Sequence, residues 1–115
     1  LSGGSPFLDQ VATHLRAALR SGDVSVTAIA AATGTSARTL QRRLQQENTN
    51  LGALLDGVRR ELGTRYVRDG HLTLERIAHS LGFVSASSFA RAFRRWTARS
   101  PREFARPAPG DGEAA

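Results

Sequence analysis

The sequence predicts an all-α fold of about seven helices. Apolar residues recur at helical spacing along most of the 115 residues, and no segment shows the sustained alternation of a half-buried strand. Serine or threonine precedes most of these segments and glycine follows several of them, as expected at helix ends. A chain of this length suits one domain, or two small subdomains that share a core.

The first half of the chain holds three predicted helices, each beginning at a serine. Ser5 caps the first, and Pro6 takes its first helical position, where the missing N–H costs nothing. Each helix carries an apolar stripe, which comprises Phe7, Val11, Leu15, Ala18 and Leu19 in the first, Val26, Ile29 and Ala30 in the second, and Leu40 and Leu44 in the third. The expected limits are Pro6 to Gly22, Ser25 to Gly34, and Ser36 to about Glu47.

The second half begins with a long helix at about residues 51–69, which Asp69-Gly70 closes. Thr73 and Ser85 are the expected caps of the fifth and sixth helices, and Ser100-Pro101 starts a short seventh. The fifth helix stops at Gly82. We expect Trp96 to be a core residue that packs with Phe93 and Phe104, the last of these buried by the seventh helix.

Composition limits the possible chemistry. There is no cysteine, which excludes disulfides, thiolate zinc sites and a cysteine nucleophile. The three histidines have no metal-ligand spacing, and the serines and threonines serve as helix caps. We therefore expect no cofactor, no metal and no enzymatic activity. No apolar stretch is long enough to cross a membrane, and the expected setting is reducing and cytoplasmic.

Charge points to a polyanionic partner. All sixteen basic residues are arginine, against ten acids, giving a net charge of +6 and a pI of about 11.5. The guanidinium is a planar, always charged fork that matches phosphate oxygens and the guanine edge. A genome-wide preference for arginine codons explains equally well why arginine replaces lysine, but not why bases exceed acids.

One local pattern occurs twice. Ile29-Ala30 with Gly34 matches Ile77-Ala78 with Gly82 at an offset of 48, and Leu40 and Leu44 match Phe89 and Phe93 at an offset of 49. The second copy thus has one extra residue after its glycine. The alanine allows a close helix crossing and the glycine adopts the positive φ that ends a helix. Two copies predict two helix-turn-helix units, at about 25–47 and 73–97.

The third helix carries polar residues suited to reading base edges. Arg38, Gln41, Arg42 and Gln45 fall at i, i+3, i+4 and i+7, on one exposed face. Arginine pairs with the guanine O6/N7 edge and glutamine with the adenine N6/N7 edge. An ordinary solvated face also carries Arg and Gln, but it usually includes acidic residues, which this helix lacks. We interpret Arg38, Gln41 and Arg42 as base-reading residues.

The second unit has a poorer set at the matching positions. The offset of 49 places Ser87, Ala90, Arg91 and Arg94 there, so only Arg91 keeps a side chain capable of a bidentate base contact. This unit is expected to depend more on backbone contacts and DNA shape. The expected backbone-contacting residues of the two units are Ser36, Gln45, Ser85, Arg94, Arg95 and Arg102.

The remaining charged residues have alternative interpretations. Arg59 and Arg60 alternate with Asp56 and Glu61, which is typical of ion pairs on a helix surface. Arg43 lies near the core-facing side of its helix, where a nearby acid is a candidate partner. A long helix of about nineteen residues spans roughly 28 Å. That length is close to the roughly 34 Å between major-groove faces one turn apart, so one chain is expected to bind successive grooves.

These residues resemble the DNA-binding domain of the AraC/XylS family of bacterial transcription regulators. The most specific stretch is "LERIAHSLGFVSASSFARAFRRWTARSPREF", and "SARTLQRRL" and "LLDGVRRELG" add the first recognition helix and the linker helix. The resemblance covers roughly residues 26–104 and implies binding to asymmetric sites in duplex DNA. By position, it assigns base reading to Arg38, Gln41 and Arg42 in the first unit and to Ser87, Ser88 and Arg91 in the second.

Two positions depart from the family pattern. Ala98 stands where the family usually has glycine, which is expected to tighten or lengthen the sixth helix. Asn48 stands near another usual glycine, and asparagine tolerates the same left-handed geometry.

The resemblance also bears on the rest of the protein. Family members usually carry a separate effector-binding or dimerisation domain, and the chain lacks an initiator methionine. We therefore expect it to be the C-terminal part of a larger regulator. The expected location is the nucleoid in the cytoplasm, and RNA polymerase is a further candidate partner. Residues 5–106 are the expected DNA-binding domain, residues 1–4 a linker or cloning remnant, and residues 107–115 a disordered tail. The alternative is a helical protein-interaction module, which exposed leucine or aromatic residues on the third helix would favour.

Overall fold

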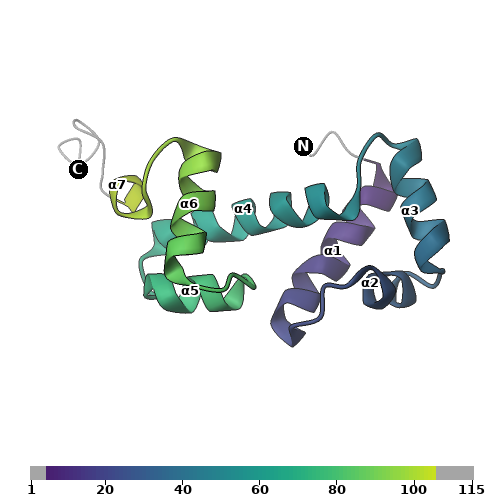
Figure 1. The fold of residues 1–115 in the computed structure, drawn as a ribbon, viewed down its shortest axis with the longest axis horizontal. Helices are drawn as coiled ribbons and strands as arrows, with labels where there is room; N and C mark the ends of the chain where they lie inside the picture. Colours follow the sequence, from purple (N-terminus) through teal and green to yellow (C-terminus); the bar gives the residue numbers. More distant parts are fainter. Residues whose placement is uncertain (1–4, 106–115) are drawn as a thin grey trace. The chain divides into compact units, whose positions relative to one another are not determined.

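The computed structural model describes residues 5–105 and confirms the all-α prediction, with seven helices and no strand in that range (Figure 1). The predicted linker at residues 1–4 and the predicted tail at 107–115 lie outside the described residues. The helices are α1 (Pro6–Ser21), α2 (Val26–Ala32), α3 (Ala37–Gln46), α4 (Leu51–Asp69), α5 (Leu74–Ser80), α6 (Ala86–Thr97) and α7 (Pro101–Ala105). The chain divides into two compact units between Arg59 and Arg60, within α4.

Serine and threonine side chains begin most of the helices, as the sequence predicts, and an asparagine begins α4. The hydroxyl oxygens of Ser5, Ser25, Ser36, Thr73 and Ser85 each accept a hydrogen bond from the backbone N–H three residues later. At α4 the Asn50 side-chain oxygen accepts from the N–H of Ala53 at 2.8 Å. Each such cap satisfies a donor that the first turn of the helix leaves unpaired.

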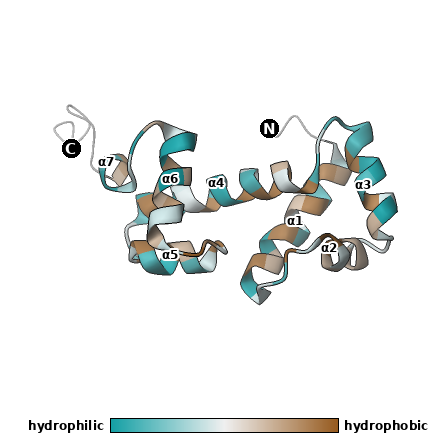
Figure 2. Ribbon diagram, viewed as in Figure 1, coloured by the Kyte–Doolittle hydropathy of each residue, from teal (hydrophilic) through white to brown (hydrophobic). Residues whose placement is uncertain are grey.

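Unit 1 is built around the apolar stripes of α1, α2 and α3. Leu15 of α1, Ile29 of α2 and Leu40 of α3 are each no more than 1% exposed. Figure 2 shows hydrophilic and hydrophobic residues interspersed along α1 and α3, as expected of amphipathic helices. The Arg43 Cζ atom lies 3.9 Å from the centroid of the Phe7 ring, so this arginine packs on an aromatic ring of α1 instead of pairing with the acid that the sequence suggested.

Unit 2 has an aromatic core. Phe89 and Phe93 of α6 are fully buried, with ring centroids 5.6 Å apart, and Phe83 lies 5.7 Å from Phe89. The α4 helix passes close to this cluster at buried Gly63. A Cβ at this position would lie only 3.0 Å from Phe89 Cε1. The small residue therefore sets how closely α4 approaches α6.

The prediction of core positions in α6 and α7 was only partly correct. Trp96 contacts Phe93, at 6.4 Å between centroids, as well as Phe83 and Phe89, but it is only half-buried. Phe104 stacks edge-on against Phe93 at 5.1 Å and is also half-buried. In α7 the buried residue is Pro101, at the start of the helix.

The two helix-turn-helix connections have the same hydrogen-bonding pattern. In the first, the N–H of Thr35 donates to Ala30 O and that of Gly34 to Ala31 O; in the second, Phe83 donates to Ala78 O and Gly82 to His79 O. Both glycines have positive φ, 76° and 82°. This is a Schellman motif used twice, as the repeat predicts.

Two non-glycine residues also adopt positive φ. Asn48 ends α3 at φ 61°, in the left-handed geometry that the sequence predicts for it. Ala98 ends α6 at φ 64°, and its N–H donates to Arg94 O. The expectation that Ala98 would alter the sixth helix was wrong, since the helix ends at Thr97 and alanine adopts the backbone conformation that glycine favours.

We expect Ala98→Gly to stabilise unit 2 by about 1 kcal/mol, because alanine in the left-handed region carries a steric cost that glycine avoids. Chemical denaturation of both proteins measures the difference. Ala90→Gly, in the middle of the same helix, is the matched control and should destabilise by about 1 kcal/mol. Destabilisation by both substitutions would show that Ala98 is not strained.

Candidate nucleic-acid interface

The predicted base-reading residues of unit 1 share one exposed face of α3. Arg38, Gln41 and Arg42 are exposed, as is Gln45 one turn further on. On the opposite face Leu40 and Leu44 are completely buried, which fixes the rotation of the helix about its axis. The polar face is therefore held outward by the packing of the apolar one.

This face lines a surface groove of about 640 Å³. The start of α4 contributes Asn50, Leu51 and Gly52 to it, and α3 contributes Arg38, Gln41, Arg42, Leu44 and Gln45. The structure thus brings the four predicted polar residues together. No acidic side chain is present in α3, so the groove carries donors and positive charge from that helix.

Ser36 and Ser85 hold the starts of the two recognition helices. The Ser36 hydroxyl accepts from the Thr39 N–H and donates to Thr39 Oγ1 at 3.0 Å. The Ser85 hydroxyl accepts from the Ser88 N–H and lies 3.1 Å from Ser88 Oγ. Both predicted backbone-contacting serines therefore have capping roles, and a phosphate oxygen would compete with these bonds.

The predicted base-reading residues of unit 2 are not equivalent to one another. Ser87 and Arg91 are exposed at i and i+4 of α6, opposite buried Phe89 and Phe93. Ser88 is half-buried, and its hydroxyl is paired with that of Ser85. Of the three predicted base-reading residues of α6, Ser87 and Arg91 are therefore the two that face outward.

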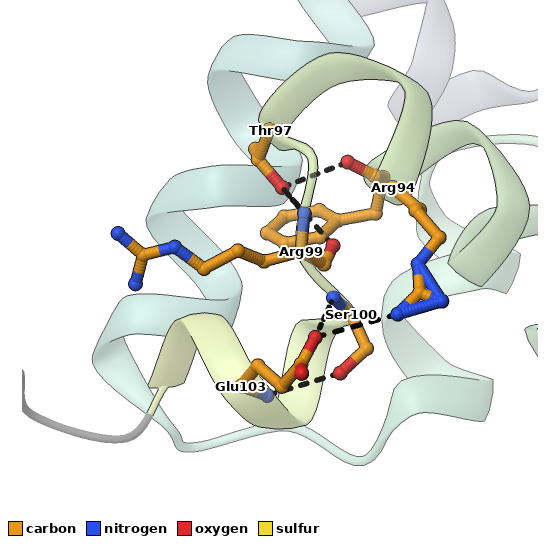
Figure 3. Close-up of polar contacts among 6 residues, drawn as sticks. Arg94, Thr97, Arg99, Ser100 and Glu103 are labelled. Atoms are coloured by element: carbon orange, nitrogen blue, oxygen red, sulfur yellow. Dashed lines mark hydrogen bonds and ion pairs between the residues drawn. The ribbon is translucent and has the colours of Figure 1, made fainter.

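The predicted backbone-contacting arginines lie at the end of α6 and in α7. Arg94, Arg95 and Arg102 are all exposed. Arg94 Nη2 lies 3.5 Å from Glu103 Oε1, and the Arg95 Cζ atom lies 5.9 Å from the Trp96 ring centroid (Figure 3 shows the Arg94 contact). An exposed ion pair of this length is weak, so Arg94 remains available to another anion.

Figure 3 shows how the chain turns from α6 into α7. The Ser100 N–H donates to Glu103 Oε1 at 2.8 Å, and the Glu103 N–H donates to Ser100 Oγ at 3.1 Å. This reciprocal pair is a capping box. The hydrogen bonds from the Ser100 backbone and side chain, followed by the charge of Arg94, lower the pKa of Glu103.

Sequence reasoning did not single out Val84. This residue is the additional one in the turn of the second unit, and its side chain is 98% exposed, beside the start of α6. The repeat in the sequence did indicate this position, since its offset is 48 before the turn and 49 after it, which leaves one additional residue in the second turn. Among residues 5–105 no group of acidic or histidine side chains has an arrangement able to hold a metal ion, and no helix is long and apolar enough to cross a membrane.

The fold and both recognition helices define a helix-turn-helix domain, and comparison with known proteins agrees. The model of a family described as "Helix-turn-helix domain" matches residues 29–107. An ornithine utilization regulator of Pseudomonas aeruginosa is 43% identical over 75 residues, which are 65% of this chain and 22% of that protein. The regulator VirS of Mycobacterium tuberculosis is 35% identical over 104 residues, 90% of this chain and 31% of that one.

Solved structures share the architecture. A DNA-binding transcriptional dual regulator of Escherichia coli K-12 has a TM-score of 0.80 at 22% identity, with coverage of 91% of this chain and 94% of that one. The regulator CdpR of Pseudomonas aeruginosa has a TM-score of 0.64 at 38% identity, with coverage of 70% and 26%. The chain belongs to the AraC-type helix-turn-helix family of DNA-binding transcription regulators. It spans between about a fifth and a third of the length of the curated relatives it matches.

The lowered pKa of Glu103 predicts acid-dependent stability. Its ionised form is favoured in the folded state, so the contribution is present above the ordinary carboxyl pKa and is lost as pH falls through the folded value. Glu103→Gln should lower the melting temperature at neutral pH, and the difference from wild type should shrink on acidification. Melting curves from pH 7 to pH 3 check this, with Ser100→Ala as a comparison that removes the hydroxyl but keeps the principal hydrogen bond, from the Ser100 backbone N–H. A constant difference across that range would contradict the assignment.

Proposed function

We propose that this chain binds duplex DNA sequence-specifically as the DNA-binding part of a transcription regulator, with α3 and α6 as recognition helices. The observation that carries the proposal is the groove along α3, where two arginines and two glutamines face outward without an acidic neighbour on that helix. Arg38 and Arg42 present forks suited to guanine, and Gln41 presents an amide suited to adenine. Gln45, at the far end of the same face, contacts the sugar-phosphate backbone of the DNA.

Unit 2 reads fewer bases and holds the DNA mainly by its backbone. Ser87 and Arg91 face outward on α6, whereas the Ser88 hydroxyl is hydrogen-bonded to that of Ser85. Arg94, Arg95 and Arg102 supply phosphate contacts, which fix register without carrying sequence information. The length of α4, which covers Leu51–Asp69, supports binding to successive major grooves of one duplex.

The remaining assignments follow from this role. We assign no catalysis to the chain, and we propose that it acts with RNA polymerase and with an N-terminal effector or dimerisation domain. A DNA partner places it on the nucleoid in the cytoplasm. The alternative, a protein-interaction module, is not favoured, because in the described part of the chain the exposed large apolar residues are Leu72, Leu74 and Val84, none of which lies on α3.

Arg42→Ala should cost about 1–3 kcal/mol of binding to the preferred duplex and relax the preference for one base pair. The substitution removes a bidentate contact to guanine that is buried in the complex with DNA. The fold is preserved because the Arg42 side chain is exposed in the free protein. Titration with the tightest duplex recovered from a randomised pool, and with a scrambled duplex, measures the effect. Arg20→Ala, an exposed arginine of α1, is the control and should leave the ratio between the two duplexes unchanged. Equal losses on both duplexes would contradict base reading by Arg42.

Arg102→Ala should weaken binding to preferred and scrambled duplexes alike, because a phosphate contact is independent of sequence. The slope of log affinity against log salt should decrease in magnitude by about 0.9, the amount expected for one phosphate contact. Titrations at several salt concentrations test this. An unchanged slope would exclude Arg102 from the backbone-contacting set.

A further inference from the structure

We propose that Val84 reads the 5-methyl group of a thymine in the major groove, at the start of recognition helix α6. The inference rests on the proposed function, which it extends by naming an apolar specificity contact. It concerns unit 2 alone, where hydrogen-bonding readers are scarce.

Val84 does not belong to the core of the protein. Its side chain is 98% exposed, whereas the valines at 11, 58 and 67 are between 0% and 5% exposed. Within residues 5–105 the other exposed large apolar residues, Leu72 and Leu74, reach only 40% and 36%. A fully solvated isopropyl group adds nothing to folding, so its apolar surface is available to a ligand.

The position of Val84 follows from the two turns. The N–H of Thr35 in unit 1 and that of Phe83 in unit 2 make the same hydrogen bond, and Ser36 and Ser85 are the matching caps. Val84 is therefore the one residue added between the turn and the cap in unit 2. The addition places an apolar side chain directly before the recognition helix.

Val84 shares a surface with a proposed base-reading residue. It lines the same groove as Ser85 and Ser87, a depression of about 480 Å³ at the start of α6. In helix-turn-helix proteins the N-terminal residues of the recognition helix contact base edges. A side chain on this surface is thus presented to the major groove together with Ser87.

The chemistry selects one base. The thymine 5-methyl group is the apolar feature of the major groove, and the characteristic contact to it is an apolar side chain. Unit 2 has Ala90 where unit 1 has Gln41, and the Ser88 hydroxyl is engaged with Ser85. A methyl contact supplies discrimination that these residues do not.

The test replaces thymine by deoxyuridine, which keeps every hydrogen-bonding group and removes only the methyl. The probe is the tightest duplex that the full chain recovers from a randomised pool. The block read by unit 2 is identified as the one where Arg91→Ala relaxes specificity. Each thymine of that block is then replaced in turn. We expect one replacement to weaken wild-type binding about fourfold, the effect of one buried methyl-sized group.

Val84→Ala should bind the thymine duplex about fourfold more weakly than wild type and no longer distinguish thymine from deoxyuridine at that position. Its melting temperature should match wild type because the side chain is solvated. Leu72→Ala, which also shortens an exposed apolar residue of unit 2, is the control. It should keep the wild-type ratio of affinities for the thymine and deoxyuridine duplexes.

Three results would overturn the proposal: no sensitive thymine, a unit 2 block without thymine, or an unchanged thymine preference in Val84→Ala. Each leaves the proposed function standing if the pool still yields a preferred sequence. A pool that yields none contradicts the proposed function and this inference together.

Discussion

The packing of α2 against α3 and of α5 against α6, with a buried alanine on the first helix of each pair, is the constraint on which both units depend. Ala30 and Ala78 are 2% and 1% exposed. Their carbonyl oxygens accept hydrogen bonds from the N–H groups of Thr35 and Phe83, five residues further along the chain. A glycine at positive φ then reverses the chain within two or three residues of the next cap. Because the turn is so short, the second helix has little freedom in direction, and its buried residues determine which face is left outward. The polar faces of α3 and α6 are consequences of that packing.

The two units use the same turn with different surfaces. Unit 1 presents a dense polar face in a groove, whereas unit 2 presents Ser87 and Arg91, an apolar residue in the turn, and arginines at the far end of α6. We propose that unit 1 reads bases mainly by hydrogen bonds, whereas unit 2 depends more on charge and on DNA shape. Such an asymmetric pair suits a site without internal symmetry.

Most of the fold could be predicted because its signals are local. Serine caps, glycine turns and apolar spacing each act within one helix or one turn, and they determined the helix order and the polar face of α3. The misjudged residues depend on tertiary contacts. Arg43 packs on Phe7, thirty-six positions earlier, and Trp96 is only half-buried although it contacts Phe83, Phe89 and Phe93. Val84 was overlooked, and the pairing of the Ser88 hydroxyl with that of Ser85 was not foreseen, because side-chain exposure and hydroxyl pairing follow from coordinates and not from spacing.

The central claim, that both units contact bases of one duplex, is tested most directly by selection of this chain's ligands from randomised duplex DNA, followed by sequencing. We expect two enriched blocks whose centres lie about one helical turn, roughly 10 base pairs, apart, with stronger preferences in the block read by α3. An absence of enrichment, with binding that collapses as salt rises, would contradict it, because the arginines would then hold DNA by charge alone.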